Sequence, residues 1–298
     1  MSDLKVYRES GEIAREVMKA GLKMIKPGKK LLEVAERVEE KIAEADARPA
    51  FPCNISVNEV AAHYSPQAWD SKVFEKGDLV KLDVGVHLDG YIADIARTIS
   101  VDGGGGENKK LIKAAEEALA EAIDMIRPGV LTNQVGERIE EVITGHGFTP
   151  ISNLTGHKLG RYNLHAGVLV PNVKTRHGNE FREGEVFALE PFATNGLGKV
   201  IDDPNAIIFR YLRDRPLRMR EARVILRHAK ENYGPLPFAE RWVANLVPKF
   251  KLNQALRQLV YSKALHAYHI LKEKERGLVA QAEHTVIVKK DGCEIITS

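Results

Sequence analysis

An internal duplication limits the folds open to this chain more than any other feature of its sequence. The segment MIKPG at 24–28 recurs as MIRPG at 125–129, 101 positions later, and seven further positions between 34 and 42 match their counterparts at the same spacing. In each copy the apolar residues after Pro-Gly recur at i, i+4 and i+8, which is typical of an amphipathic helix. The duplication therefore predicts two equivalent halves that each contain a pair of helices.

A second matched pair extends the two halves into strands. FEKGDLVKLD at 74–83 resembles FREGEVFALE at 181–190, and both segments run from a glycine turn through apolar residues to a carboxylate, Asp83 or Glu190. The chain is therefore predicted to be an α+β domain with pseudo-two-fold symmetry, with antiparallel strands in the middle and helices outside. A functional site is expected on the internal axis, where Asp83 and Glu190 occupy equivalent positions.

The symmetry breaks in the second half. After Asp83 the next strand is expected at 90–101, whereas after Glu190 the comparable strand, 278–289, comes much later. Residues 204–270 hold 13 Lys+Arg and 4 Asp+Glu, a net charge of +9, while the whole chain carries +3. We interpret 204–270 as an inserted basic helical subdomain and 1–203 with 271–298 as the catalytic domain. The positive charge of the 204–270 subdomain leaves two roles open. The subdomain could contact ribosomal RNA, or it could be a solvated surface that only shapes the cleft.

The remaining composition indicates a globular protein of a reducing compartment. The apolar fraction is 44%, and no apolar run approaches the roughly 20 residues that span a bilayer. The N-terminal segment mixes charges with apolar residues, unlike a signal peptide. Two cysteines, Cys53 and Cys293, give no disulfide framework, which favours the cytoplasm. The glycine run 103–106 lacks the Lys-Ser/Thr of a phosphate loop and is predicted to be a flexible turn.

Four carboxylates stand among apolar residues of predicted strands. Asp83 and Asp94 lie on two strands joined by a hairpin around 89–90, which can bring both side chains to one face. Glu190 and Glu283 lie in similarly apolar stretches. Each acid alone could pair with a buried arginine. Four converging acids would repel one another, however, and a bound cation is the simplest way to stabilise them.

Histidines complete the candidate site. His157 and His165 lie in a glycine-punctuated loop or edge strand, and His63 lies in an earlier segment. The sequence contains no His-Glu-x-x-His, no cysteine cluster and no Gly-x-Ser-x-Gly, which disfavours a thermolysin-like zinc site and a serine nucleophile. Cys53 stays open as a thiol nucleophile, although its neighbours offer no obvious activating base.

In this order and context, five residues resemble the metal ligands of the methionine aminopeptidases, whose fold is called the pita-bread fold: Asp83, Asp94, His157, Glu190 and Glu283. The resemblance covers essentially the whole chain. The Gly-x-x-x-Gly-Arg-Tyr-x-x-His-Ala-Gly setting of His165 and the insertion before the last ligand look like the type II branch. Without a long charged N-terminal extension, the chain is similar to the archaeal form.

The resemblance implies a role for each residue. One metal would be held by Asp83 and the other by His157 and Glu190, with Asp94 and Glu283 bridging the two. Glu190 would also move a proton, and the remaining candidates would contact substrate: His63 the leaving amide nitrogen, His165 the scissile carbonyl, and Phe51 and Leu164 the methionine side chain. Phe51 and Leu164 could equally be ordinary core residues. The donor set suits Mn or Fe(II), with Co as a laboratory substitute.

The resemblance also implies a substrate, the N-terminal methionine of nascent proteins, and we expect a monomer without membrane contact. Two other interpretations remain open. One is an Xaa-Pro peptidase or creatinase-type hydrolase on the same fold, although these enzymes usually carry an additional N-terminal domain. The other is a non-catalytic pita-bread protein that binds RNA or the ribosome. The presence of all five ligand residues argues against the second alternative.

Overall fold

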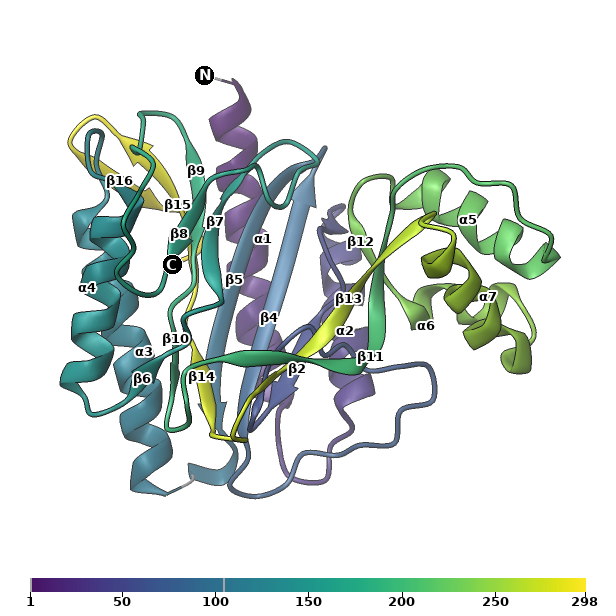
Figure 1. Ribbon diagram of the computed structural model, residues 1–298, viewed down its shortest axis with the longest axis horizontal. Coiled ribbons are helices and arrows are strands. Elements are labelled where there is room, and N and C mark those ends of the chain that lie inside the picture. Colours follow the sequence, from purple (N-terminus) through teal and green to yellow (C-terminus); the bar gives the residue numbers. More distant parts are fainter. Residues whose placement is uncertain (1, 104) are drawn as a thin grey trace.

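The computed structural model describes residues 2–103 and 105–298, and its helices repeat with the spacing of the duplication (Figure 1). Each half contributes two long helices: α1 (Ser2–Met24) and α2 (Leu31–Glu44), then α3 (Gly106–Met125) and α4 (Thr132–Gly145). The bounds of α4 lie 101 residues after those of α2. Gly28 and Gly129, at the same spacing, both adopt positive φ, 79° and 91°, as the turns between the paired helices require.

The described strands form sheets of three to five strands, and every pairing within these sheets is antiparallel. The first half holds a four-stranded sheet of β1 (Arg48–Pro49), β2 (Asn54–Val57), β4 (Leu79–Leu88) and β5 (Tyr91–Ser100). The second half holds a five-stranded sheet of β7 (Thr155–Leu159), β8 (Leu169–Pro171), β9 (Val186–Leu189), β15 (His284–Lys289) and β16 (Gly292–Ile295). A three-stranded sheet adds β6 (Thr149–Pro150), β10 (Phe192–Thr194) and β14 (Val279–Gln281).

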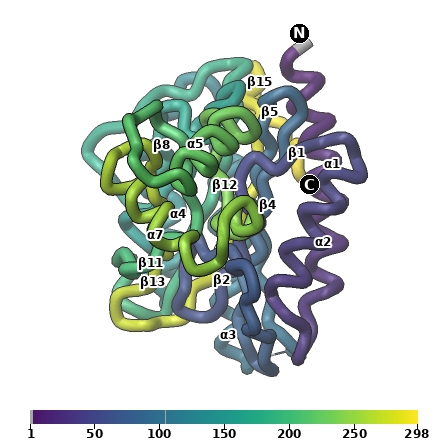
Figure 2. Tube along the Cα trace, turned by 90° about the vertical axis from the view of Figure 1, so that its right-hand side faces the viewer, coloured from purple at the N-terminus to yellow at the C-terminus, as the bar shows by residue number. Residues whose placement is uncertain are grey.

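Helices cover the outer side of both halves. Helices α1 and α2 run side by side along one face of the molecule, α1 against β4 and β5, while α3 and α4 cover the second half (Figures 1 and 2). Each half has its own apolar cluster. Val34, Val38 and Leu82 are fully buried in the first, and Val135, Ile139 and Phe187 are buried in the second. The amphipathic pattern of the sequence thus places its apolar stripes against the sheets.

The insertion forms a third layer at one side of the molecule (Figure 1). Its sheet contains β3 (Val60–Ala62), β11 (Val200–Tyr211), β12 (Pro237–Ala239) and β13 (Leu265–Glu273). Its helices are α5 (Arg220–Asn232), α6 (Glu240–Val243) and α7 (Lys249–Tyr261), with a 3-10 turn η2 (Ala244–Leu246). The 204–270 segment is therefore not only helical, because it begins and ends in the long β11–β13 ladder. The net charge of the segment, on which the helical interpretation rested, does not distinguish strands from helices.

Two further expectations concern short segments. The predicted strand 278–289 is divided into β14 and β15, and the break falls at Ala282–Glu283. Within the glycine run 103–106, Gly103 ends a 3-10 turn η1 (Val101–Gly103) and Gly106 begins α3, while residue 104 lies outside the described residues. In the part of the chain that the structure describes, none of the helices combines the length and the apolar character needed to cross a membrane.

Candidate metal centre and catalytic cavity

Strands β4 and β5 carry the first two acids into the middle of the molecule. The hairpin turns at Asp89 and Gly90, whose positive φ values of 47° and 85° match a two-residue turn. In the resulting register Gly85 faces Asp94 and Asp83 faces Ala96, so the two acids are diagonal neighbours on one face. The hairpin predicted from the sequence therefore brings them together.

The last two acids lie where strands are interrupted. Glu190 stands between β9 and β10 and is followed by Pro191, and Glu283 stands between β14 and β15. The Glu283 N–H donates to the Ala96 carbonyl at 3.0 Å, which joins the two halves beside Asp83. Because these residues leave the regular ladder, their side chains can turn toward the cavity instead of alternating with the sheet.

His157, in the middle of β7, completes the cluster. Its Nε2 atom lies 3.5 Å from Glu190 Oε1 and 3.8 Å from Asp94 Oδ2. One donor atom each from Asp94, His157 and Glu283 lie within 4.8 Å of one another, and all three residues are buried. Asp83 and Glu190 face the same cavity, which has a volume of about 200 Å³. The five residues singled out in the sequence therefore converge from five separate segments.

Burial strongly perturbs the protonation of this cluster. It raises the pKa of Asp83 to about 7. Burial, reinforced by repulsion from neighbouring carboxylates, raises the pKa values of Asp94, Glu190 and Glu283 well above their usual range. The pKa of His157 falls to about 3, again mainly through burial. The imidazole is therefore neutral and has a lone pair available to a cation.

The cluster fits a bound cation because the protein itself supplies too little positive charge and too few donors. Asp83 Oδ1 and Asp94 Oδ1 are buried and have no hydrogen-bond partner among the described residues. No lysine or arginine of the described chain forms an ion pair with these acids. Buried carboxylates without partners are costly, and oxygen donors with one imidazole suit a divalent metal. The arrangement can thus hold metal.

A glutamine and an asparagine also contact the acids. Gln281 Nε2 lies 3.3 Å from Glu190 Oε2 and 3.4 Å from Glu283 Oε2, and Asn54 Nδ2 lies 3.4 Å from Asp83 Oδ2. Neither residue carries a motif that singles it out in the sequence. A sequence signal existed for Gln281, because in the continuous strand predicted at 278–289 a residue two positions before Glu283 falls on the same face.

The candidate substrate histidines lie at the same cavity. The centroid of the His165 ring is 4.4 Å from that of His157, and burial lowers the pKa of His165 to about 4. His63 adopts a positive φ of 64°, and its Nδ1–H donates to the His269 carbonyl at 3.1 Å. That bond leaves Nε2 of His63 as an acceptor. Both rings are therefore neutral near pH 7 and can exchange hydrogen bonds with a peptide.

The apolar part of the cavity includes both residues expected to line a side-chain pocket, Phe51 and Leu164. The insertion adds walls that the sequence did not predict: Ile208, Pro237 and Tyr268. Cys53 is buried, and burial raises the pKa of its thiol well above the usual value, which disfavours a nucleophilic role.

Comparisons with known proteins identify a family of metal-dependent peptidases. Residues 5–290 match the model of metallopeptidase family M24. The chain is 53% identical over its full length to the full-length methionine aminopeptidase of Thermococcus kodakarensis, and 51% identical, again over both full lengths, to that of Thermococcus onnurineus. Among solved structures, the methionine aminopeptidase of Thermotoga maritima aligns with a TM-score of 0.75 and 24% identity, covering 100% of this chain and 97% of that one. This last likeness concerns the fold, the α+β pita-bread architecture.

Proposed function

Because this chain belongs to metallopeptidase family M24, and within it to the type II methionine aminopeptidases, we propose that five buried side chains hold two divalent metal ions: Asp83, Asp94, His157, Glu190 and Glu283. The enzyme removes the N-terminal methionine from proteins. The observation that most supports two bound metal ions is the convergence of four buried carboxyl groups, to which no lysine or arginine of the described residues forms a salt bridge. Two ions would balance this charge better than one.

One ion would be held by Asp83 and the other by His157 and Glu190, and Asp94 and Glu283 would contribute to holding both. The short distances between His157 Nε2 and the carboxylates of Asp94 and Glu190 support this grouping. A donor set of carboxylates and one imidazole favours Mn or Fe(II), and Co is a suitable laboratory substitute.

Divalent ions in such a site supply a nucleophilic water at neutral pH and stabilise negative charge that develops on the substrate carbonyl. The chain's own residues position the peptide and move the protons. Glu190 accepts a proton from the attacking water and passes it to the leaving amine. His165 donates to the scissile carbonyl. His63, whose Nδ1–H is held by the His269 carbonyl, accepts the leaving amide N–H at Nε2.

The methionine side chain is assigned to the apolar end of the cavity. Phe51 and Leu164 form its core wall, and Ile208 and Tyr268 form its insertion wall. These groups are apolar or aromatic and can exclude water around a thioether. Because one chain supplies every wall and every proposed ligand, we infer that the enzyme acts as a monomer.

Hydrolysis of three tripeptides tests this function. Metal-free and Mn-loaded enzyme are incubated with Met-Ala-Ser, Ala-Ala-Ser and Leu-Ala-Ser, and the released amino acids are quantified. The expected result is Mn-dependent release of methionine, with little alanine or leucine. Equal cleavage of all three peptides would contradict the methionine pocket. Undiminished activity in rigorously chelated samples would contradict the metal mechanism.

We also propose that the basic insertion contacts ribosomal RNA where nascent chains emerge, which places the enzyme in the cytoplasm. Its net charge of +9 over 204–270 supports this, as does a strongly exposed Phe250 between Lys249 and Lys251. Such binding weakens steeply as salt increases. Cosedimentation with ribosomes at 50–300 mM salt (roughly the range in which phosphate contacts are lost) tests the proposal. Association that ignores salt, or no association, would favour a surface that only shapes the cleft.

A further inference from the structure

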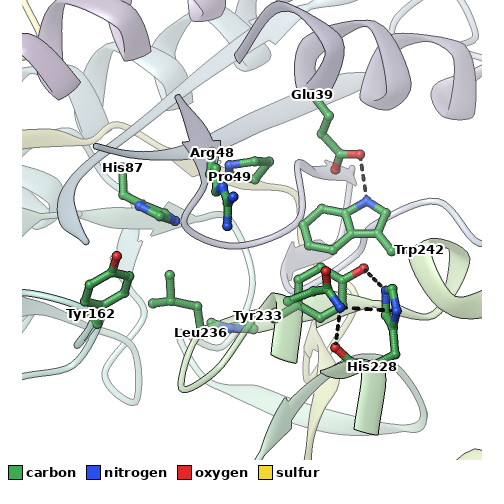
Figure 3. Close-up of a pocket in the computed structure, with 11 residues that line it drawn as sticks. Glu39, Arg48, Pro49, His87, Tyr162, His228, Tyr233, Leu236 and Trp242 are labelled. Carbon is green, nitrogen blue, oxygen red and sulfur yellow. Dashed lines mark hydrogen bonds between the residues drawn. The ribbon is translucent and has the colours of Figure 1, made fainter. Parts of the chain in front are cut away.

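A second cavity, of about 370 Å³, lies between the first half of the core and the insertion (Figure 3). The core supplies Arg48 and His87, and the insertion supplies Asn232, Tyr233 and Trp242. A volume of this size is enough for a small organic ligand. None of these five side chains belongs to the catalytic cavity, and the removal of methionine gives them no role.

A shared wall separates the two cavities. Pro237 faces both of them. Along the 48–51 segment, Pro49 lines the second cavity and Phe51 lines the catalytic cavity. Similarly, Tyr162 lines the second cavity and Leu164 lines the catalytic cavity. The second cavity is therefore a neighbouring site and not an extension of the methionine pocket.

The core side of the second cavity presents hydrogen-bond donors. The Arg48 side chain is exposed and has no ion pair or hydrogen bond within residues 2–103 and 105–298. In Figure 3 its guanidinium lies between His87 and Trp242, with no bond drawn to it. His87 Nδ1 accepts the Gly90 N–H at 3.1 Å, so Nε2 carries the ring proton. Arg48 and His87 together can therefore donate to an anionic group.

The insertion side presents aromatic rings and an amide acceptor. The Tyr233 and Trp242 rings lie 5.3 Å apart. Asn232 donates through Nδ2 to the His228 carbonyl at 2.9 Å and to the His228 ring, which leaves the amide oxygen of Asn232 free to accept. These groups suit a flat ring that carries an amino group, since aromatic side chains stack on such rings and the amide can accept from the amino group.

Among the residues that line this cavity, the one carboxylate, Glu39, is already neutralised. Glu39 accepts the Trp242 indole N–H at 2.8 Å and forms an ion pair with Arg241. Its charge therefore does not oppose an anion bound at Arg48. Among the residues that line the cavity, Arg48 is the one lysine or arginine.

We propose that this cavity is a binding site for a nucleoside monophosphate. The phosphate binds Arg48 and the Nε2–H of His87, and the base packs against Tyr233 and Trp242. An amino group on the base, as in adenine or cytosine, donates to the Asn232 amide oxygen. A ligand held in this way links the core to the insertion and stabilises their relative position.

Tryptophan fluorescence tests the proposal because the chain has only two tryptophans, Trp69 and Trp242. In a Trp69→Phe background, Trp242 is the sole reporter, and adenosine 5′-monophosphate is titrated into the full-length metal-loaded chain. We expect a saturable change in fluorescence with one ligand per chain, together with a rise in melting temperature. Arg48→Gln should weaken this binding about tenfold or more and make the monophosphate bind no better than adenosine.

Arg213→Gln is the matched control, because Arg213 is an exposed arginine of the basic insertion that does not line the cavity. This variant should keep the parent affinity. Three results would overturn the proposal: no saturable change, equal weakening by Arg48→Gln and Arg213→Gln, or binding that survives Arg48→Gln, as binding at the metal centre would. The assay does not depend on turnover, so its failure leaves the peptidase function untouched.

Discussion

Single residues at the catalytic cavity show how buried carboxyl groups, whose burial lowers stability, are accommodated in the fold. Asp94 and Glu283 are almost fully buried, and burial and mutual repulsion raise their pKa values. A domain tolerates such groups when something compensates their charge. The sequence predicted these acids because each interrupts an apolar strand. It could not predict Tyr268 or Ile208, since an aromatic or aliphatic residue in a strand gives no sign of which cavity it faces.

The substitutions Asp94→Asn and Glu283→Gln test the two proposed shared ligands. We expect each to lower the turnover of Met-Ala-Ser by at least about a hundredfold, because a carboxamide is a poor bridge between cations. Without metal, each variant should be at least as stable as the parent, since one repelling carboxylate is gone. Steady-state kinetics and thermal melts measure both effects, and Asp291→Asn in an exposed turn is the control. Near-normal turnover in either variant would show that the acid is not shared.

His87 makes stability depend on pH. Burial, with a smaller contribution from Arg48, lowers its pKa from 6.5 to about 4 in the folded state. Between these values the unfolded chain binds a proton that the folded chain does not, so stability falls as pH decreases from about 6.5 to about 4. We expect His87→Gln to remove up to about 3 kcal/mol of that loss. Urea unfolding at pH 7 and at pH 4.5 measures it. An identical pH dependence in parent and variant would contradict the assignment.

At the scale of elements, one face of β4 organises both cavities. Asp83, Gly85 and His87 are every second residue of β4 and therefore share that face. The strand thus runs from the metal site, beneath Phe51, to the second cavity. The repeat in the sequence predicted this strand and the helices outside it, and the turn residues at 89–90 predicted its hairpin with β5. It did not predict the β11–β13 ladder, because that ladder belongs to the insertion, which has no counterpart in the first half.

Gly85→Ala tests the position of Phe51 on β4. An added Cβ would lie 2.2 Å from the Phe51 ring, so this ring, which lines the cavity proposed to hold methionine, must shift. We expect a loss of stability of about 1–3 kcal/mol and a higher KM for Met-Ala-Ser, with kcat changed less. Gly145→Ala is the control, since an added Cβ there meets nothing within 4 Å. An unchanged KM would mean that Phe51 does not line the methionine pocket.

At the scale of the whole molecule, the insertion is attached to the core through polar groups as well as strands. Arg241 of α6 pairs with Glu39 of α2 and donates to Ser65 Oγ at 2.6 Å and to the Pro66 carbonyl at 2.9 Å. Both charged side chains are largely removed from solvent. The sequence could not reveal this link, because the two residues are 202 positions apart and each stands in an ordinary amphipathic segment.

Arg241→Met is expected to lower the free energy of unfolding by about 3–5 kcal/mol, because it leaves the Glu39 carboxylate buried without its partner. Adding Glu39→Gln should recover part of the loss, since it removes the unpaired buried charge, and the single amide oxygen can still accept from either the Trp242 indole or the Cys53 N–H. Chemical denaturation of the parent, both single variants and the double variant measures the coupling. Additive losses would show that the two charges do not depend on each other.

In the two-ion assignment, five side chains from separate segments hold two divalent ions between the two halves of the duplicated core. Anomalous diffraction from crystals of the enzyme loaded with Mn²⁺ addresses it most directly. We predict two anomalous peaks inside the cavity, within coordination distance of Asp83, Asp94, His157, Glu190 and Glu283. A single peak, or peaks only elsewhere on the molecule, would contradict the claim.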